Sequence, residues 1–481
     1  MYKNSRGRPG VALAAVAVAQ FAVALDLSVV NVALPAIRTA LGFAPLDLSW
    51  VVHVYALTLG GFLLLGGRAC DLYGRRRLFV LGLAVFGLCS LAGGLAQAPW
   101  QLIAARAGQG LGAAAATPAT LAMLTTTFPE GPRVRALGVW SGVNAAGGAL
   151  GVLAGGLLTQ YAGWRWVMLI NLPIVAVALA LVRAGVPTEA RPARRERLDV
   201  LGAVLATGGV GLLVTGVVRT DAQGWDSPAT WTMLVAAAML LAAFVVTESR
   251  ASAPLLRLSL LRSRWVAGAN VLVFFSTAGQ FAAFYFVSLY LQEVLGMGAA
   301  ATGAAFLPFS VSLVAGTLVA TRVTAARTPR ASLVPGALLA AAGLTLFAFI
   351  SPDGGFLTDV LGPCIITGIG VGLVIAPVVA AATTGVAPRE AGMASGLINS
   401  SRQLGGCIGL AALAAIAAHR TGTATDPDAI NDGYALGLAI AAALFVLAAV
   451  VAIVVLPRRR AESPAPQPTT TAENRLEGMP S

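Results

Sequence analysis

The chain contains 481 residues, of which 57% are hydrophobic and only 11% are charged. Because soluble domains carry roughly 25% charged residues, this composition excludes an ordinary soluble protein and favours one that crosses the bilayer many times. The formal net charge of +12 does not predict a nucleic-acid partner, since the arginines lie in short loops between apolar segments and form no continuous basic face. The four cysteines show no spacing typical of a metal site or a disulfide framework.

Apolar segments follow one another along the whole sequence, and each is about long enough to cross the hydrocarbon core as a helix. We count fourteen of them, at 11–37, 48–67, 78–97, 100–124, 136–160, 164–186, 198–218, 229–247, 266–292, 300–320, 331–350, 356–382, 393–418 and 433–456. The sequence therefore predicts an all-α integral membrane protein.

The positions of the basic residues predict the orientation of these helices. With both termini placed on one side, all but five of the 32 lysines and arginines fall in loops of that side. Cytoplasmic loops carry such an excess. We therefore expect a multi-pass protein of the cell membrane with a cytoplasmic N-terminus and a cytoplasmic C-terminus.

The order of the segments predicts two bundles of six helices with a further pair between them in the sequence. The expected units are a cytoplasmic N-terminus (1–10), an N-terminal six-helix bundle (11–186), a linker with two extra transmembrane helices (187–265), a C-terminal six-helix bundle (266–456) and a disordered cytoplasmic tail (457–481). The loop at 321–330 stands where a repeat of 67–77 would fall, which weakly suggests that the two bundles are repeats.

Asp26 is the only carboxylate deep within a predicted helix, and Arg106 is the only arginine so placed. At 1.5 Å per residue, Asp26 lies about 22 Å along the first helix and Arg106 roughly 9 Å from the outer end of the fourth, so their depths are similar. Charges inside a membrane are costly and usually functional, and these two should approach one another or share a water-filled cavity. The alternatives are a carboxylate that only caps or packs, and a purely structural ion pair.

The segment 67–77, GRACDLYGRRR, reads as a tight cytoplasmic loop between the second and third helices. Gly67 and Gly74 allow a turn, while Asp71 can cap a helix end or pair with an arginine such as Arg75. The simpler interpretation is that these charges only set the topology.

The fifth helix is rich in glycine. Gly147, Gly151 and Gly155 recur every four residues and predict a smooth face for another backbone, with Gly156 beside it. Packing is the simplest explanation, although packing that moves could also serve gating.

Other polar residues in or near the helices carry weaker predictions. His53, near the outer end of the second helix, is more often a bystander than a proton relay, and Glu293 is expected to be a solvated carboxylate at the outer surface. No phosphate loop, metal cluster or nucleophile–base pair supports catalysis, so we expect no enzyme and no cofactor.

Five motifs together resemble a known family. The segment 67–77 is similar to the loop between helices two and three of the major facilitator superfamily. The remaining four resemble motifs of its fourteen-helix drug:proton antiporters, at 25–35 (LDLSVVNVALP), 106–112 (RAGQGLG), 164–173 (WRW followed by INLP) and 394–406 (ASGLIN followed by RQLGG). The resemblance covers about residues 11 to 456.

This resemblance implies the major-facilitator fold, two six-helix bundles plus two extra central helices, and export of drugs, antibiotics or other hydrophobic or amphipathic compounds by alternating access. Asp26 would be a proton or cationic-substrate site and Arg106 would assist proton transfer, while Asp71 and Arg75 would belong to a cytoplasmic gate. The implied partners are small hydrophobic or cationic molecules, protons and the lipid bilayer, with no nucleic acid and with a monomer as the working expectation. The proton gradient would supply the energy.

One departure from the family pattern concerns the fifth helix. The antiporter motif has a proline after the glycine at position 151, whereas this chain has Val152. The helix should then be straighter, which weakens the antiport assignment more than the family assignment. Two other functions stay open at this point, namely a nutrient or siderophore uptake carrier and, more remotely, a membrane enzyme or sensor.

Overall fold

A computed structural model gives the fold of most of the chain. The residues that it describes are 9–44, 47–128, 130–186, 199–223, 227–251, 254, 258–384, 386, 391–422 and 426–456. Within these ranges the ordered elements are helices and no β-strand occurs. The sequence prediction of an all-α protein is therefore confirmed.

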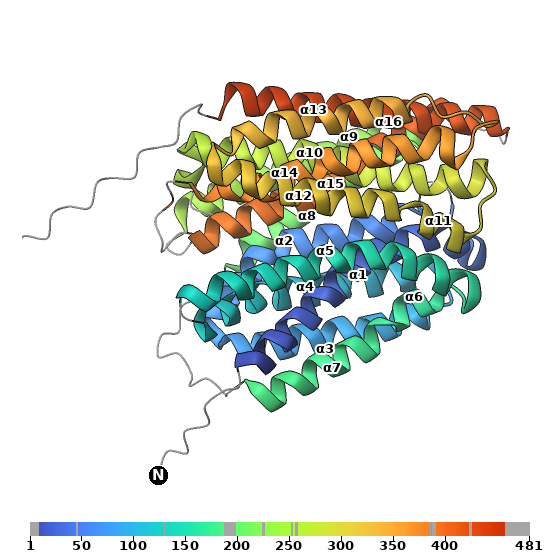
Figure 1. The fold of residues 1–481 in the computed structure, drawn as a ribbon. Coiled ribbons are helices and arrows are strands. Elements are labelled where there is room, and N and C mark those ends of the chain that lie inside the picture. Colours follow the sequence, from blue (N-terminus) through green and yellow to red (C-terminus); the bar gives the residue numbers. More distant parts are fainter. Residues whose placement is uncertain are drawn as a thin grey trace, which may run out of the picture.

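The first group of helices is packed together in the part of Figure 1 coloured blue to green. Its members are α1 (Pro9–Leu41), α2 (Trp50–Tyr73), α3 (Arg75–Gly94), α4 (Pro99–Thr127), α5 (Glu130–Tyr161), the short α6 (Arg165–Leu169) and α7 (Asn171–Gly185). The main contacts pair α1 with α5 and α7, and α4 with α2 and α3. We call α1–α7 the first half.

The second group, coloured yellow to red in Figure 1, follows the same plan. It contains α10 (Arg264–Leu289), α11 (Ala299–Ala305), α12 (Leu307–Ala326), α13 (Arg330–Phe347), α14 (Leu361–Thr383), α15 (Ala391–Thr421) and α16 (Pro427–Val454), with the 3-10 helix η1 (Leu258–Arg262) before it and the π-helical turns η2 (Tyr290–Val294) and η3 (Phe356–Val360) within it. Here α14 packs on α12 and α13, and α10 packs on α15 and α16. We call α10–α16 the second half.

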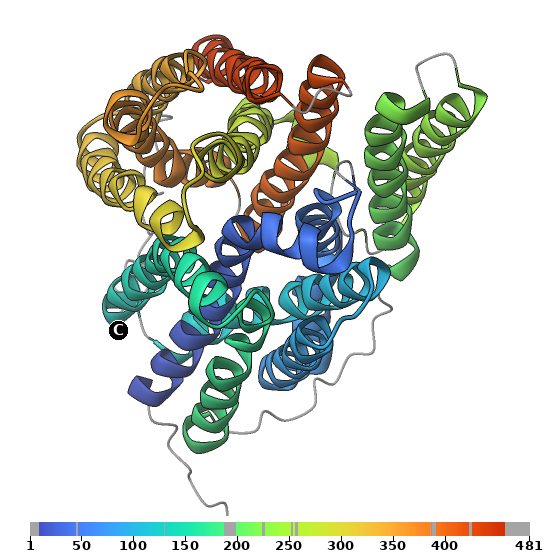
Figure 2. The same ribbon diagram turned by 90° about the vertical axis from the view of Figure 1, so that its right-hand side faces the viewer.

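The two remaining helices, α8 (Val200–Gln223) and α9 (Pro228–Arg250), form a hairpin of their own. Figure 2 shows this green pair at one side of the molecule. It is central in the sequence but peripheral in space, because α8 packs on α2 of the first half and α15 of the second, while α9 packs mainly on α8. Most of the apolar surface of α9 faces outward. A helix can face lipid in this way because its backbone groups are hydrogen-bonded within the helix.

Thirteen helical segments among the described residues are long and apolar enough to cross a membrane. The long helix missing from that set is α4, whose apolar character is lowered by Arg106 and Gln109. Because α4 runs along α2 and α3 inside the first half, we count it as the fourteenth span. All fourteen segments predicted from the sequence thus have a helical counterpart.

The structure corrects the prediction of a loop at 67–77. Helix α2 continues to Tyr73 and α3 begins at Arg75, so Gly74 alone separates them. Gly74 has a φ of 93°, a left-handed conformation that favours glycine. Gly67 lies inside α2 and makes no turn; it faces Pro118 of α4.

The helices run between two ends of the molecule, which we name after α1. The Pro9 end is the one at which α1 begins, and the Leu41 end is the one at which it finishes. The charge asymmetry of the sequence predicts that the Pro9 end is cytoplasmic and the Leu41 end external.

Candidate functional site

Asp26 of α1 and Arg106 of α4 form an ion pair inside the first half. The Arg106 Nη1 and Asp26 Oδ2 atoms are 2.5 Å apart, and the Arg106 and Asp26 side chains are 1% and 0% exposed. The expectation that the two charges would approach one another is therefore confirmed. A buried ion pair needs further hydrogen bonds to offset the loss of hydration.

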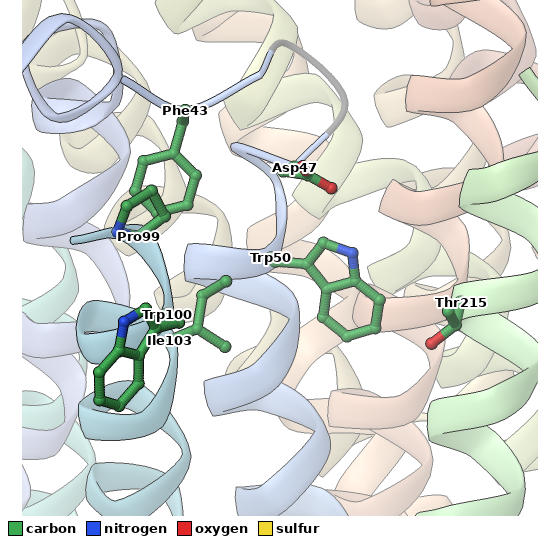
Figure 3. Close-up of a pocket in the computed structure, with 7 residues that line it drawn as sticks. All are labelled: Phe43, Asp47, Trp50, Pro99, Trp100, Ile103 and Thr215. Carbon is green, nitrogen blue, oxygen red and sulfur yellow. The ribbon is translucent and has the colours of Figure 1, made fainter. Parts of the chain in front are cut away.

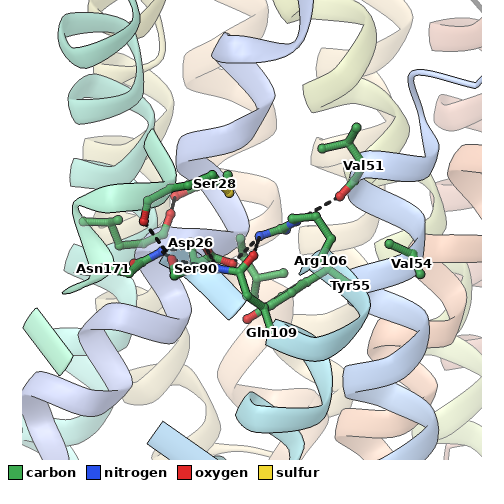
Figure 4. A network of polar contacts seen from close by, with 12 residues as sticks. Asp26, Ser28, Val51, Val54, Tyr55, Ser90, Arg106, Gln109 and Asn171 are labelled. Carbon is green, nitrogen blue, oxygen red and sulfur yellow. Dashed lines mark hydrogen bonds and ion pairs between the residues drawn. The ribbon is translucent and has the colours of Figure 1, made fainter. Parts of the chain in front are cut away.

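The second oxygen of the Asp26 carboxylate has two more donors. The Asn171 side-chain amide of α7 donates to Asp26 Oδ1 over 2.8 Å, and the Gln109 amide of α4 donates to the same oxygen over 3.2 Å. Both amides also donate to the Ser90 hydroxyl of α3, over 3.0 Å each. Ser90 in turn donates to the Met168 carbonyl, over 2.7 Å. These side chains come from α1, α3, α4 and α7, and Figure 4 shows them converging.

The Arg106 guanidinium is held from the side of α2 as well. Its Nε donates to the Val51 carbonyl over 3.0 Å, and its Nη1 also lies 3.1 Å from Gln109 Oε1. The guanidinium carbon lies 4.2 Å from the centre of the Tyr55 ring, within the range of a cation–π contact. We call Asp26, Ser90, Arg106, Gln109 and Asn171 the buried polar network.

Small residues of α4 bring these helices close enough for the network to form. Gly110 lies against the Tyr55 carbonyl of α2, and Gly112 lies against the Gly82 carbonyl of α3, where an added Cβ would approach within 2.6 and 2.7 Å. Larger side chains would push α4 away from both neighbours. The motif that contains Arg106 thus supplies both the charge and the close packing that buries it.

The donor pattern around Asp26 fits an ionised carboxylate, which only accepts hydrogen bonds. A protonated carboxyl carries an O–H donor, so at least one of the present contacts would have to rearrange on protonation. Two buried polar atoms at the edge of the network, Tyr55 Oη and Asn171 Oδ1, have no hydrogen-bond partner among the described residues. Such atoms are places where a water molecule or a rearranged donor can be accommodated.

The glycines of the fifth predicted helix pack as expected. Gly147, Gly151 and Gly155 of α5 lie against α1, where an added Cβ at Gly155 would overlap the Val29 carbonyl oxygen. Gly156 points elsewhere, because it lies against Ala299 of α11 in the second half. Helix α5 (Glu130–Tyr161) continues through Val152 without a break.

The residues predicted to form a cytoplasmic gate lie away from this network. Gly67 and Gly74 belong to the stretch around the α2–α3 junction, at the Pro9 end, as does the partly buried Arg75. The Asp71 side chain is outside the described part of the structure. The gating role of this segment stays a prediction.

Glu293 is not the solvated carboxylate that was expected. Its side chain is only 16% exposed and pairs with Arg38 of α1, with 2.9 Å between Oε1 and Nη2. The Tyr434 hydroxyl of α16 donates to Oε2 over 2.7 Å. The prediction was wrong because it considered only the depth of Glu293 and not which helices of either half lie beside it.

His53 is fully buried in α2 and lies edge-on to Trp50, with 5.8 Å between ring centres. Neither ring nitrogen has a hydrogen-bond partner among the described residues, so His53 stands outside the network. That His53 is a bystander and not a proton relay stays a prediction.

Sequence reasoning did not single out Ser90, Gln109 or Asn171. Two of them lie within the family motifs, since Gln109 belongs to RAGQGLG and Asn171 to INLP. Uncharged polar residues inside apolar helices at a depth similar to that of Asp26 were the available signal. Ser90 could not be singled out in this way, because a lone serine in a membrane helix commonly donates a hydrogen bond to the backbone of its own helix.

Comparison with known proteins identifies the family of this chain. Residues 16–410 match the model of the Major Facilitator Superfamily. The cephamycin export protein CmcT of Amycolatopsis lactamdurans is 42% identical over 457 residues, which cover 94% of this chain and 93% of that protein. The puromycin resistance protein pur8 of Streptomyces alboniger is 39% identical over 460 residues, which cover 93% of this chain and 91% of that protein.

A solved structure supports the same fold. A bacterial homologue of the human lysosomal transporter Spinster, in an inward-facing and unoccupied conformation, aligns with a TM-score of 0.68 at 18% identity and covers 96% of this chain and 100% of that one. With the family match and the relatives above, this likeness leads to one conclusion. The chain is a multi-pass membrane protein and belongs to the Major Facilitator Superfamily.

Proposed function

We propose that the protein is a proton-coupled efflux transporter that exports antibiotics or other hydrophobic or amphipathic small molecules by alternating access. The observation that carries this proposal is the Asp26–Arg106 pair. It is fully buried within one half of a transporter fold, and the Asp26 carboxylate also accepts hydrogen bonds from Gln109 and Asn171. Relatives named for cephamycin export and puromycin resistance support the substrate class.

In this mechanism Asp26 exchanges its proton as the transporter changes conformation. The ionised carboxylate is stabilised by Arg106 and by the amides of Gln109 and Asn171. Protonation removes the negative charge that Arg106 faces, so the guanidinium has to find other acceptors, such as the Val51 carbonyl that it already contacts. Loading and release of the proton therefore shift the packing of α1 against α4, which links proton movement to helix movement.

Several other assignments belong to this proposal. The two halves would rock against each other, with the segment around Asp71 and Arg75 as the gate at the cytoplasmic Pro9 end. The units would be those expected from the sequence, with six helices in 11–186, six in 266–456 and the pair in 187–265. The proton gradient would drive export without a cofactor, and each 100 mV of membrane potential contributes about 2.3 kcal/mol per charge moved.

Reconstituted protein tests the proposal directly. The full chain is placed in liposomes, and the movement of puromycin and of the fluorescent cation ethidium is followed under an imposed pH gradient. We expect substrate to move against its gradient only while protons flow the opposite way, and a protonophore to stop it. Transport that is unaffected by the direction or collapse of the pH gradient would refute proton coupling, and accumulation in the direction of proton flow would indicate uptake.

A further inference from the structure

A pocket of about 320 Å³ opens at the Leu41 end, apart from the buried polar network. It lies where the α1–α2 connection and the first turns of α2 and α4 meet α8 of the peripheral pair. Its lining residues are Phe43, Asp47, Trp50, Pro99, Trp100, Ile103 and Thr215. In Figure 3, Trp50 lies between the group formed by Phe43, Pro99, Trp100 and Ile103 and the Thr215 side chain, which α8 contributes.

The lining combines apolar side chains with polar groups, one of which is charged among the described residues. Trp50, Trp100 and Ile103 present two indole rings and an aliphatic side chain. Asp47 is the one charged side chain among the described residues of the lining, and it is exposed. The Thr215 hydroxyl donates to the Gly211 carbonyl over 2.7 Å, which leaves its oxygen free to accept a hydrogen bond.

We propose that this pocket binds an amphipathic amine, with the apolar body against the rings and the ammonium group beside Asp47. The Asp47 carboxylate, the one charge among the described lining residues, favours a positive ligand. Indole faces attract cations and cover apolar chains. A volume of about 320 Å³ lies at the lower end of the range for sites that hold drug-sized molecules.

One side of the pocket is formed by the peripheral pair α8–α9. Thr215 stands on α8, whereas the other lining residues belong to the first half. The pocket therefore assigns a binding role to a helix that lies outside both halves. Trp100 is 68% exposed, so a bound molecule would remove a large apolar area from water or from the headgroup region.

The pocket also lies close to the buried polar network without being part of it. Trp50 directly precedes Val51, whose carbonyl accepts from Arg106, and Ile103 lies about one helical turn before Arg106 on α4. An occupant would thus rest on the same two helix ends that hold Arg106. The chemistry of the ligand, an ammonium on an apolar body, fits both a free amphipathic amine and an aminolipid of the leaflet at this end.

Photolabelling of the full chain in nanodiscs tests the proposal. The probe is dodecylamine with a diazirine at the end of its chain, and the matched probe is the corresponding dodecanol, which has no charge. Labelled peptides are identified by mass spectrometry. We expect the amine to label residues of the pocket at least roughly threefold more strongly than the alcohol does, since exposed ion pairs are worth up to about 1 kcal/mol. Equal labelling by both probes would show an aromatic membrane belt and overturn the proposal.

Two variants separate charge from apolar contact. Asp47→Asn should lower amine labelling of the pocket roughly three- to fivefold and leave the alcohol unchanged. Trp100→Ala should lower labelling by both probes. Asp432→Asn and Trp231→Ala are matched controls, because Asp432 and Trp231 are also exposed and lie near the Leu41 end on α16 and α9. If the controls act as strongly as the pocket variants, the pocket has no special role.

The lipid composition of the nanodiscs distinguishes the two sources of the amine. Discs with phosphatidylethanolamine should suppress probe labelling if an aminolipid occupies the pocket, and discs with phosphatidylglycerol alone should restore it. Labelling that is the same in both would indicate a free amine as the occupant, and labelling outside the pocket in both would contradict the proposal. The measurement needs no transport, so Asp26→Asn should retain pocket labelling even where efflux is lost.

Discussion

Two ion pairs of this protein differ in position and in surroundings. Asp26 and Arg106 lie in α1 and α4 of the same half and are fully buried. Arg38 and Glu293 join α1 of the first half to η2 of the second at the Leu41 end, and their side chains are 37% and 16% exposed. If the halves rock against each other, the first pair can persist through the cycle, whereas the second has to separate each time the Leu41 end opens.

The junction between the halves contains other contacts of the same kind. Gln160 of α5 accepts from the Ala300 backbone N–H of α11 over 2.9 Å, and the Ser288 hydroxyl of α10 donates to the Asn31 carbonyl of α1 over 3.3 Å. The first contact is exposed and the second is only partly buried, and single hydrogen bonds of this kind contribute little. From this comparison we expect the buried pair to matter for proton binding, and the contacts at the Leu41 end to stabilise the conformation in which that end is closed.

The largest effect is expected from Asp26→Asn, which should abolish gradient-driven export. Asparagine keeps the shape but cannot take up a proton, and it leaves Arg106 buried without its counter-charge, at a cost of about 3–5 kcal/mol. Asp26→Glu should retain part of the activity. Efflux from proteoliposomes under an imposed pH gradient measures the loss, and thermal unfolding of the purified protein measures the cost.

The double variant Asp26→Asn with Arg106→Gln separates the two roles of Asp26. Removing both charges should restore most of the stability, because no unpaired buried charge remains. It should not restore export, because no group titrates. If the double variant pumps at the wild-type rate, the pair is structural and the proton site lies elsewhere.

Gln109→Leu should have the next largest effect. It removes one donor from Asp26 and one acceptor from Arg106 but leaves the ion pair in place. An unsatisfied buried polar group costs about 1–3 kcal/mol, and we expect export to fall roughly tenfold. The matched control is Gln20→Leu, since Gln20 is also buried and its amide donates to the Asn144 side chain over 2.7 Å. Equal losses in both variants would contradict a special role for the network.

Val152→Pro tests the helix that contacts both α1 and the other half. Val152 is buried, and its carbonyl oxygen would lie 2.8 Å from a Cβ added at Gly303 of α11. Proline removes one helical hydrogen bond and bends the helix, although neighbouring helices can partly compensate in a membrane. We expect several-fold less protein in the membrane, measured by quantitative blotting, with export per molecule reduced less. Full expression and activity would show that α5 tolerates the bend of the family motif.

The sequence predicted the fold and the central pair because both are local signals. Apolar segments give helices, and a carboxylate and an arginine stand out where nearly every neighbour is apolar. The surroundings of Glu293 were not predictable in this way, because its partners Arg38 and Tyr434 belong to helices far away in the chain. Depth along one helix is readable from the sequence, whereas the neighbour at that depth depends on how the halves meet.

The turn at Gly74 shows a second limit. Glycine and charged residues at 67–77 resemble a loop, yet the backbone stays helical up to Tyr73. Helices readily extend beyond the hydrocarbon core, where charged side chains reach water. Composition therefore marks the end of the apolar span and not the end of the helix.

The smallest effect is expected at the Arg38–Glu293 pair, and it should appear in conformation more than in stability. Arg38→Gln and Glu293→Gln should each change the free energy of unfolding by less than about 1 kcal/mol, because the pair is partly exposed. The reporter is Ser288→Cys, a nearly isosteric change at a fully buried residue between the halves. Labelling by a membrane-impermeant thiol reagent, corrected for the native cysteines, measures how often this junction opens.

Each single variant should raise the labelling rate roughly two- to fivefold, which corresponds to a shift of about 0.5–1 kcal/mol toward the open state. The exchanged pair, Arg38→Glu with Glu293→Arg, should return the rate toward that of the reporter alone, since the attraction between α1 and η2 is rebuilt. Arg420→Gln is the matched control, because Arg420 pairs with Asp432 at the same end, over 3.1 Å, but within the second half. A pair that does not bridge the halves should leave the opening rate unchanged. If Arg420→Gln accelerates labelling as much as Arg38→Gln does, the effect comes from surface charge and not from a contact that has to break.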